Sequence, residues 1–147
     1  MIRSIYELIN QLIGHGVSIE PNGNSLKLVR PPSLPSWEDA PEEVKALLRE
    51  LKANKQEVTC FLLWRDMLER CNQSYRPGAL QWARTHFPEL LKTLSEAENQ
   101  YQAAYWQQDI AGVRQAAEIW ETTMKRICLL HQLAEGGEVL NEAEKPF

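Results

Sequence analysis

The side chains best suited to metal or nucleophilic chemistry are three cysteines and three histidines: Cys60, Cys71, Cys128, His15, His86 and His131. No two cysteines form a C-x-x-C pair and no two histidines stand at zinc-ligand spacing, so we predict no metal site. Cys128 and His131 would meet on one helix face, but no acid or oxyanion donor accompanies them. A cysteine in an apolar helix is typical of core packing, and we predict a protein without catalytic residues.

The composition and charge of the chain argue against several further classes of function. The chain has 147 residues and a net charge of -4, with acidic and basic residues interspersed, so it lacks the basic block of a nonspecific nucleic-acid binder. No apolar run is long enough to cross a membrane. None of the seven glycines belongs to a phosphate-binding loop, and we predict no cofactor. Few cysteines and no signal-peptide pattern favour a cytoplasmic location.

The first thirty residues predict a helix followed by a β-hairpin. Apolar residues recur at helical spacing over residues 4–14, and Ser4 with Glu7 forms a capping box at the start. Two short alternating segments follow, separated by the sequence PNGN. An Asn-Gly pair between alternating segments is a strong hairpin signal.

This hairpin is the candidate binding surface. We expect one face to pack on the first helix and the other to lie in solvent. Two strands without a larger sheet leave rows of unpaired backbone groups, to which an extended peptide can add as a further strand. The alternative for the charged residues is that they only keep an exposed edge soluble. The predicted partner-binding residues are Ser18, Glu20, Lys27, Val29 and Arg30.

Helices are predicted for most of the remaining chain. The proline-rich segment 30–35 cannot be regular structure and leads to helical residues that continue to about Cys71, with a break near Asn54. A second linker at 72–78 precedes a short helix at 79–86.

Two longer segments near the C-terminus predict an antiparallel helical hairpin. Their apolar residues repeat at alternating spacings of four and three over residues 88–107 and 110–135. Asp109 is the expected N-cap of the second helix, and Gly136-Gly137 is its expected end. The predicted fold class is mostly α with one small β-hairpin (α+β): a module at residues 1–71, then a helical region at residues 72–147.

Residues 4–63 also show a characteristic order of elements, with apolar residues at fixed positions and one short motif between two helices. They combine a leucine-rich helix ending near Gly16-Val17, a short hairpin, and a Lys-x-Glu-Val junction at residues 55–58 between two helices. This part of the chain resembles the TubC-type N-terminal docking domain of natural-product megasynthase subunits.

The resemblance implies an αββαα docking module. Such a module would bind a short, often acidic C-terminal segment of a partner protein near Lys27, Val29 and Arg30, and some members form homodimers. Here a helical hairpin follows the module, where a megasynthase subunit has a very large enzyme. The leading hypothesis is therefore a non-enzymatic docking or adaptor protein whose partner is a protein or short peptide.

A nucleic-acid-associated accessory protein of a mobile element is the alternative. Four arginines near the second linker could form a local basic stripe, although the net charge makes nucleic acid the less favoured partner. They are Arg65, Arg70, Arg76 and Arg84.

Five tryptophans are many for a chain of this length. Most are expected in the core, because large aromatic side chains dominate small helical bundles. An exposed one, such as Trp37 or Trp106, could anchor a partner.

Overall fold

A computed structural model describes the backbone of residues 4–144 and the side chains of residues 4–136. Within this range the fold is mostly α with one small β-hairpin, as predicted. The helices and strands are α1 (Ile5–Gly14), β1 (Ser18–Asn22), β2 (Ser25–Val29), the 3-10 helix η1 (Trp37–Asp39), α2 (Glu42–Ala53), α3 (Lys55–Ser74), α4 (Ala79–His86), α5 (Pro88–Trp106) and α6 (Ile110–Glu144).

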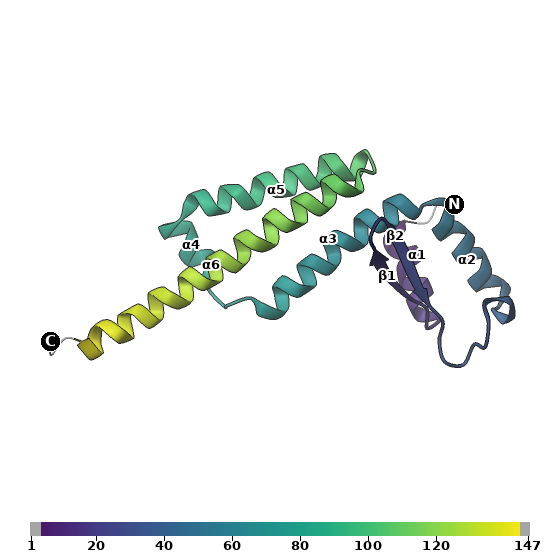
Figure 1. Cartoon of the computed structure of the whole chain (residues 1–147), viewed down its shortest axis with the longest axis horizontal. Helices are drawn as coiled ribbons and strands as arrows, with labels where there is room; N and C mark the ends of the chain where they lie inside the picture. Colours follow the sequence, from purple (N-terminus) through teal and green to yellow (C-terminus); the bar gives the residue numbers. More distant parts are fainter. Residues whose placement is uncertain (1–3, 145–147) are drawn as a thin grey trace.

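The molecule is elongated, and α3 connects its two ends (Figure 1). The hairpin, α1 and α2 lie at one end, while α4, α5 and most of α6 lie at the other. The first half of α3 contributes Val58 and Leu62 to one hydrophobic cluster, and its second half contributes Met67 and Cys71 to another. The helix thus runs through the boundary predicted at residue 71, and the division at that residue stays a prediction.

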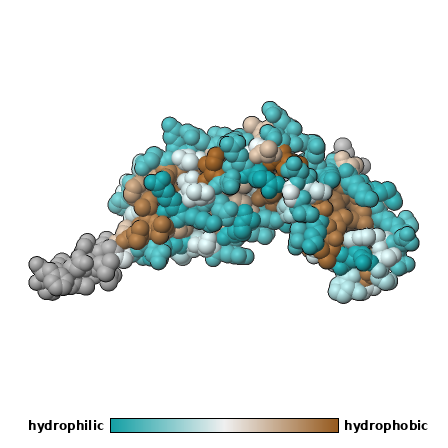
Figure 2. Space-filling model, viewed as in Figure 1, coloured by the Kyte–Doolittle hydropathy of each residue, from teal (hydrophilic) through white to brown (hydrophobic). Residues whose placement is uncertain are grey.

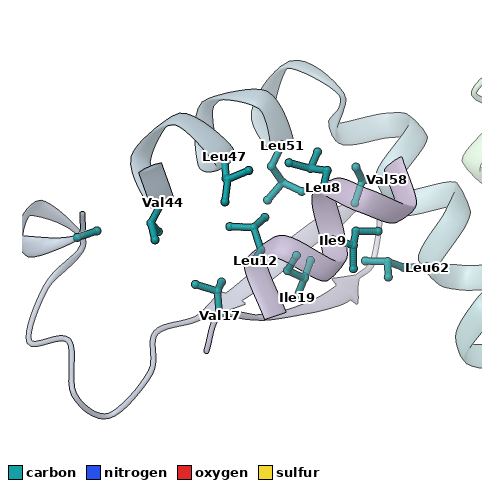
Figure 3. Packing of buried hydrophobic residues seen from close by; sticks show 11 residues of the cluster. Leu8, Ile9, Leu12, Val17, Ile19, Val44, Leu47, Leu51, Val58 and Leu62 are labelled. Atoms are coloured by element: carbon teal, nitrogen blue, oxygen red, sulfur yellow. The ribbon is translucent and has the colours of Figure 1, made fainter. Parts of the chain in front are cut away.

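Aliphatic side chains form the core at the hairpin end. Leu8 and Leu12 of α1 face α2, while Ile19 of β1 points toward α1 (Figure 3). The predicted stripe of α1 is buried at Leu8, Ile9 and Leu12, whereas Ile13, also expected in the stripe, is 49% exposed. The Ser4 hydroxyl accepts the Glu7 N–H at 3.1 Å, which confirms the predicted helix start.

The end of α1 sets the direction of the hairpin. Gly16 has a φ of +84°, a left-handed conformation that glycine adopts without a Cβ penalty. A Cβ at this position would lie 2.9 Å from the Cβ of Pro31, so the linker after β2 lies directly against the start of β1. Residues 18–22 can then run back along α1 as β1.

The hairpin turn lies within the predicted PNGN segment. Asn22 pairs with Ser25, so the two-residue loop is Gly23-Asn24. Gly23 has a φ of +62° and Asn24 does not have a positive φ, as a type II′ turn requires. A glycine at the first central position therefore decided the turn.

The opposite end of the molecule is packed with smaller residues and aromatic rings. Ala79, Ala83 and Met124 are buried there. The ring of Trp64 stacks on Tyr101 with centroids 4.2 Å apart and meets Trp120 edge to face at 6.2 Å. These contacts join α3 to both helices of the predicted antiparallel hairpin, α5 and α6.

A tight turn joins α5 to α6. Asp109 N–H donates to the Ala104 carbonyl at 2.9 Å and Gln108 N–H to the Tyr105 carbonyl at 3.0 Å, the two hydrogen bonds of a Schellman motif. Gln108 occupies the left-handed position at a φ of +54°. The Asp109 carboxylate accepts the Gly112 N–H at 3.1 Å, which confirms the predicted N-cap.

The predicted end of α6 is wrong. The helix passes through Gly136-Gly137 and continues to Glu144 instead of ending at residue 135. A glycine inside a helix costs about 1 kcal/mol relative to alanine, whereas ending a helix requires a competing cap. The residues on either side (Leu133, Ala134 and Glu135 before, VLNEAE after) are mostly strong helix formers.

Candidate docking hairpin

The hairpin register brings four of the five predicted partner-binding residues onto one surface. Ser18 pairs with Val29, and Glu20 pairs with Lys27. All four are exposed, and Val29 is 42% exposed although it is apolar. In an antiparallel pair, opposite residues point to the same face, so these side chains form a small surface with one acid, one base and one apolar residue.

Arg30, the fifth predicted residue, lies just beyond β2. It is exposed, but its guanidinium donates a hydrogen bond to the Pro35 carbonyl of the linker. The side chain thus holds the linker close to the end of β2, and one hydrogen bond leaves further N–H donors on the exposed guanidinium.

The opposite face of the hairpin is covered by the chain itself. Ile19 is 7% exposed, and Leu26 and Leu28 pack against the cluster that α1, α2 and α3 share. At the turn, Arg114 of α6 donates to the Gly23 carbonyl at 2.6 Å. The hairpin is therefore fixed at its turn and on one face, while the predicted face stays uncovered.

The pairing also determines which backbone groups point out of the sheet. In a hairpin with a two-residue loop, the pair beside the loop is hydrogen-bonded, and the pairs then alternate. Ser18, Glu20, Lys27 and Val29 consequently use their N–H and C=O groups within the hairpin. The outward groups of β2 belong to Leu26 and Leu28.

The two edges of the hairpin are unequal. The outward residues of β1 are Ile19 and Pro21, and Pro21 has no N–H to donate. On β2, both Leu26 and Leu28 offer an N–H and a C=O, and no hydrogen bond from outside the hairpin reaches them within residues 4–144. A third strand would therefore add to β2.

Leu26 and Leu28 are the site residues that sequence reasoning missed. The sequence does contain a signal for them. Once the loop is known, hydrogen-bonded and non-hydrogen-bonded pairs alternate along the strands, so the residues whose backbone groups point outward can be read from the sequence. Pro21 then marks β1 as the edge with fewer N–H donors. The position of the loop decides this alternation, because moving the loop by one residue would exchange the inward and outward backbone groups.

A shallow depression beside β2 could receive a side chain of such a strand. Its volume is about 410 Å³, and it lies where β2 passes into the linker. The space-filling view shows apolar residues gathered in the region of the hairpin among hydrophilic ones (Figure 2). The residues that line the depression are Leu28, Val29, Arg30, Pro31, Pro32 and Leu34.

The residues considered for other chemistry lie apart from the hairpin. Cys60 and Cys71 are buried, and burial raises the pKa of both thiols. Within residues 4–136, no group of three His, Cys, Asp or Glu side chains is placed to hold a metal ion. Among the helices described, none has the length and apolar character needed to span a bilayer.

The predicted basic stripe is largely neutralised by carboxylates. Arg65 pairs with Asp66 at 3.3 Å, and Arg70 binds Glu121 through two hydrogen bonds of 3.0 and 3.1 Å. Arg76 pairs with Glu135 and also donates to His131. Three of the four arginines thus have acidic partners within the chain, which weakens the case for nucleic acid.

No protein-family model matches the chain, and neither a curated protein nor a solved structure matches it.

Proposed function

We propose that this chain is a non-enzymatic docking protein that binds a short, extended segment of a partner protein along β2. The observation that supports this most is the outward-facing edge at Leu26 and Leu28, which offers two N–H and two C=O groups in a fixed hairpin. Main-chain hydrogen bonds of this kind give affinity in β-strand addition, and adjacent side-chain pockets give specificity.

The charge beside this edge favours an acidic segment. Lys27 is exposed within β2 and Arg30 is exposed just after it, whereas Glu20 lies across on β1, away from the β2 edge. Each exposed ion pair would contribute little affinity, yet together they select the sign of the partner's charge and speed association. The TubC-type resemblance of residues 4–63 supports the same kind of partner.

The proposal can be tested by an amide NMR titration. The probe is a blocked peptide of alternating valine and glutamate, about eight residues long, which is enough to span β2. We expect the largest shifts at the Leu26 and Leu28 amides, and smaller ones at Lys27 and Val29, whose N–H groups already serve the hairpin. A peptide with lysine in place of glutamate should bind more weakly.

Two charge reversals give a matched comparison. Lys27→Glu should weaken binding of the acidic peptide about three- to tenfold, while Lys52→Glu on the exposed side of α2 should leave it unchanged. Glu20→Lys should strengthen binding. The docking proposal is wrong if saturating peptide never shifts the Leu26 and Leu28 amides of the folded protein.

A further inference from the structure

A second concave surface is lined by the N-terminal end of α1, the α2–α3 junction and the end of α5. Figure 1 shows these elements close together near the end marked N. Its volume is about 630 Å³. Two of its residues are unusually exposed for aromatic side chains: Trp106 at 84% and Tyr6 at 62%. The remaining lining residues are Ser4, Ile5, Leu8, Glu50, Asn54, Glu57, Phe61 and Tyr105.

Local structure fixes the aromatic side of this cavity. Trp106 is the last residue of α5, directly before the Schellman turn, so its backbone position is set by the hydrogen bonds of that turn. Phe61 packs against the aliphatic core from α3. The exposed indole therefore belongs to a rigid helix end and not to a mobile loop.

The carboxylate of Glu57 is fixed as well. The Tyr105 hydroxyl donates to Glu57 Oε2 at 3.1 Å, a bond between α5 and α3 that leaves the other carboxylate oxygen available. Burial, and after it the charge of Glu57, raises the pKa of the Tyr105 hydroxyl, which therefore remains a donor at neutral pH. Among residues 4–136, no lysine, arginine or histidine lines the cavity and none forms an ion pair with Glu57.

We propose that this cavity binds a cationic side chain, lysine or arginine, presented by a partner polypeptide. Aromatic rings attract cations through their negative faces, and the lining supplies Tyr6, Phe61, Tyr105 and Trp106 together with the carboxylates of Glu50 and Glu57. An anion would be repelled by the carboxylate of Glu57, and a purely apolar group would leave the negative charge of Glu57 without an opposite charge. Arginine and lysine also carry apolar stems that cover aromatic surface while the charged end meets the acid.

This site goes beyond the docking hairpin, because its residues and its preferred charge are different. The hairpin edge is expected to take an acidic strand, and the cavity a basic side chain. A partner that carries both features would contact the two surfaces, yet each surface can be tested with its own probe. Failure of one test leaves the other intact.

The test is an NMR titration of the full-length protein with a small blocked peptide, arginine between two glycines. The signal to follow is the Trp106 indole N–H, assigned by its loss in Trp106→Phe. We expect saturable shifts of this indole and of amides in the α5–α6 turn, which decrease as salt is added. Matched peptides with norleucine or glutamate in place of arginine should give no saturable shift.

Glu57→Gln is the sharpest variant, because glutamine keeps an acceptor for Tyr105 and removes only the charge. We expect it to weaken binding of the arginine peptide about tenfold, as loss of a charge-assisted hydrogen bond would. Trp106→Ala should weaken binding as well, followed through the backbone amides. Glu96→Gln, on the exposed side of α5, is the control and should not change the affinity.

Three results would overturn the proposal. Equal shifts with the norleucine peptide would mean that the cavity binds apolar groups without regard to charge. Binding that appears only in Arg3→Ala would assign the cavity to the chain's own N-terminal segment. Loss of self-association in Trp106→Ala, measured by sedimentation, together with no peptide binding, would assign the indole to a second copy of the chain.

Discussion

The two ends of the molecule are packed with different kinds of side chain. The core beneath the hairpin consists of fully buried leucine, isoleucine and valine from α1, β1, α2 and α3. The core between α3, α4, α5 and α6 also buries Leu94 and Ile127, but it adds buried alanine, methionine and cysteine, with tryptophan and tyrosine rings that stay partly exposed. We therefore expect the first core to lose most stability when a large side chain is shortened. The second core should lose most when a small residue is enlarged, because small residues there set how closely the helices approach.

This difference suits the two candidate surfaces. A hairpin of two strands is marginal by itself, so the peptide-binding edge depends on a dense aliphatic core behind it. The helical end needs close helix contacts, and Gly112 shows how close they are: a Cβ there would lie 3.0 Å from the Cβ of Ala104. Both surfaces are then held on rigid elements, as precise recognition requires.

The largest effect should come from the aliphatic core. Leu12→Ala removes a side chain with no exposed surface and should lower the free energy of unfolding by about 2–5 kcal/mol. Ile13→Ala, at a neighbouring position that is 49% exposed, should change it by less than about 0.5 kcal/mol. Chemical denaturation of both variants measures the difference, and equal losses would contradict the packing described for α1.

Adding volume at the helical end should have a smaller effect. Ala83 of α4 has no exposed surface, so Ala83→Leu should cost about 1–3 kcal/mol of stability through overpacking. Ala103→Leu, on the exposed side of α5, is the matched control and should be close to neutral. If Ala83→Leu were as stable as the control, the flexible methionine side chains would have rearranged to make room for the leucine. The two cores would then not differ in their response to added volume.

The smallest effect concerns the link between α3 and α6. The hydrogen bonds from Arg70 are the main reason that the pKa of Glu121 lies below its ordinary 4.5. A lowered pKa in the folded state stabilises the protein above the ordinary value, and this stability is lost as pH falls through the lowered one. Arg70→Ala should therefore cost at most about 1 kcal/mol near neutral pH, because Arg70 is largely exposed.

The pH dependence of stability shows whether the loss in Arg70→Ala comes from the ion pair with Glu121. Thermal unfolding of the protein and of Arg70→Ala between neutral and acidic pH should show two curves that converge once Glu121 is protonated in both. A constant gap across the range would mean that the loss comes from packing of the Arg70 stem and not from the ion pair.

The elements with strong local signals could be predicted from the sequence. The capping residue Ser4, the break at Asn54 and the N-cap at Asp109 each act on the backbone within a few residues, and all three lie where expected. The PNGN segment predicted the hairpin but not its register, because both Asn22-Gly23 and Gly23-Asn24 can form two-residue loops.

The candidate cavity could not be predicted in the same way. It joins Tyr6, Glu57 and Trp106, which are far apart in the sequence and meet only because α5 returns beside the first half of α3. The exposed position of Trp106 was one of two alternatives; the other, Trp37, packs against the aliphatic core. Helical spacing reports which face is apolar but not which neighbour covers it.

The continuity of α3 limits how this protein can be dissected. A fragment that stops after residue 63 would retain the hairpin but lose the aromatic wall formed by Tyr105 and Trp106, and a longer one that stops at Ser74 would bare Met67 and Cys71 to water. Fragments of either length are therefore poor substitutes for the whole chain in binding assays. To transplant the hairpin onto another protein, α3 would have to be moved with it. The host protein would also have to provide an apolar surface that covers the second half of that helix.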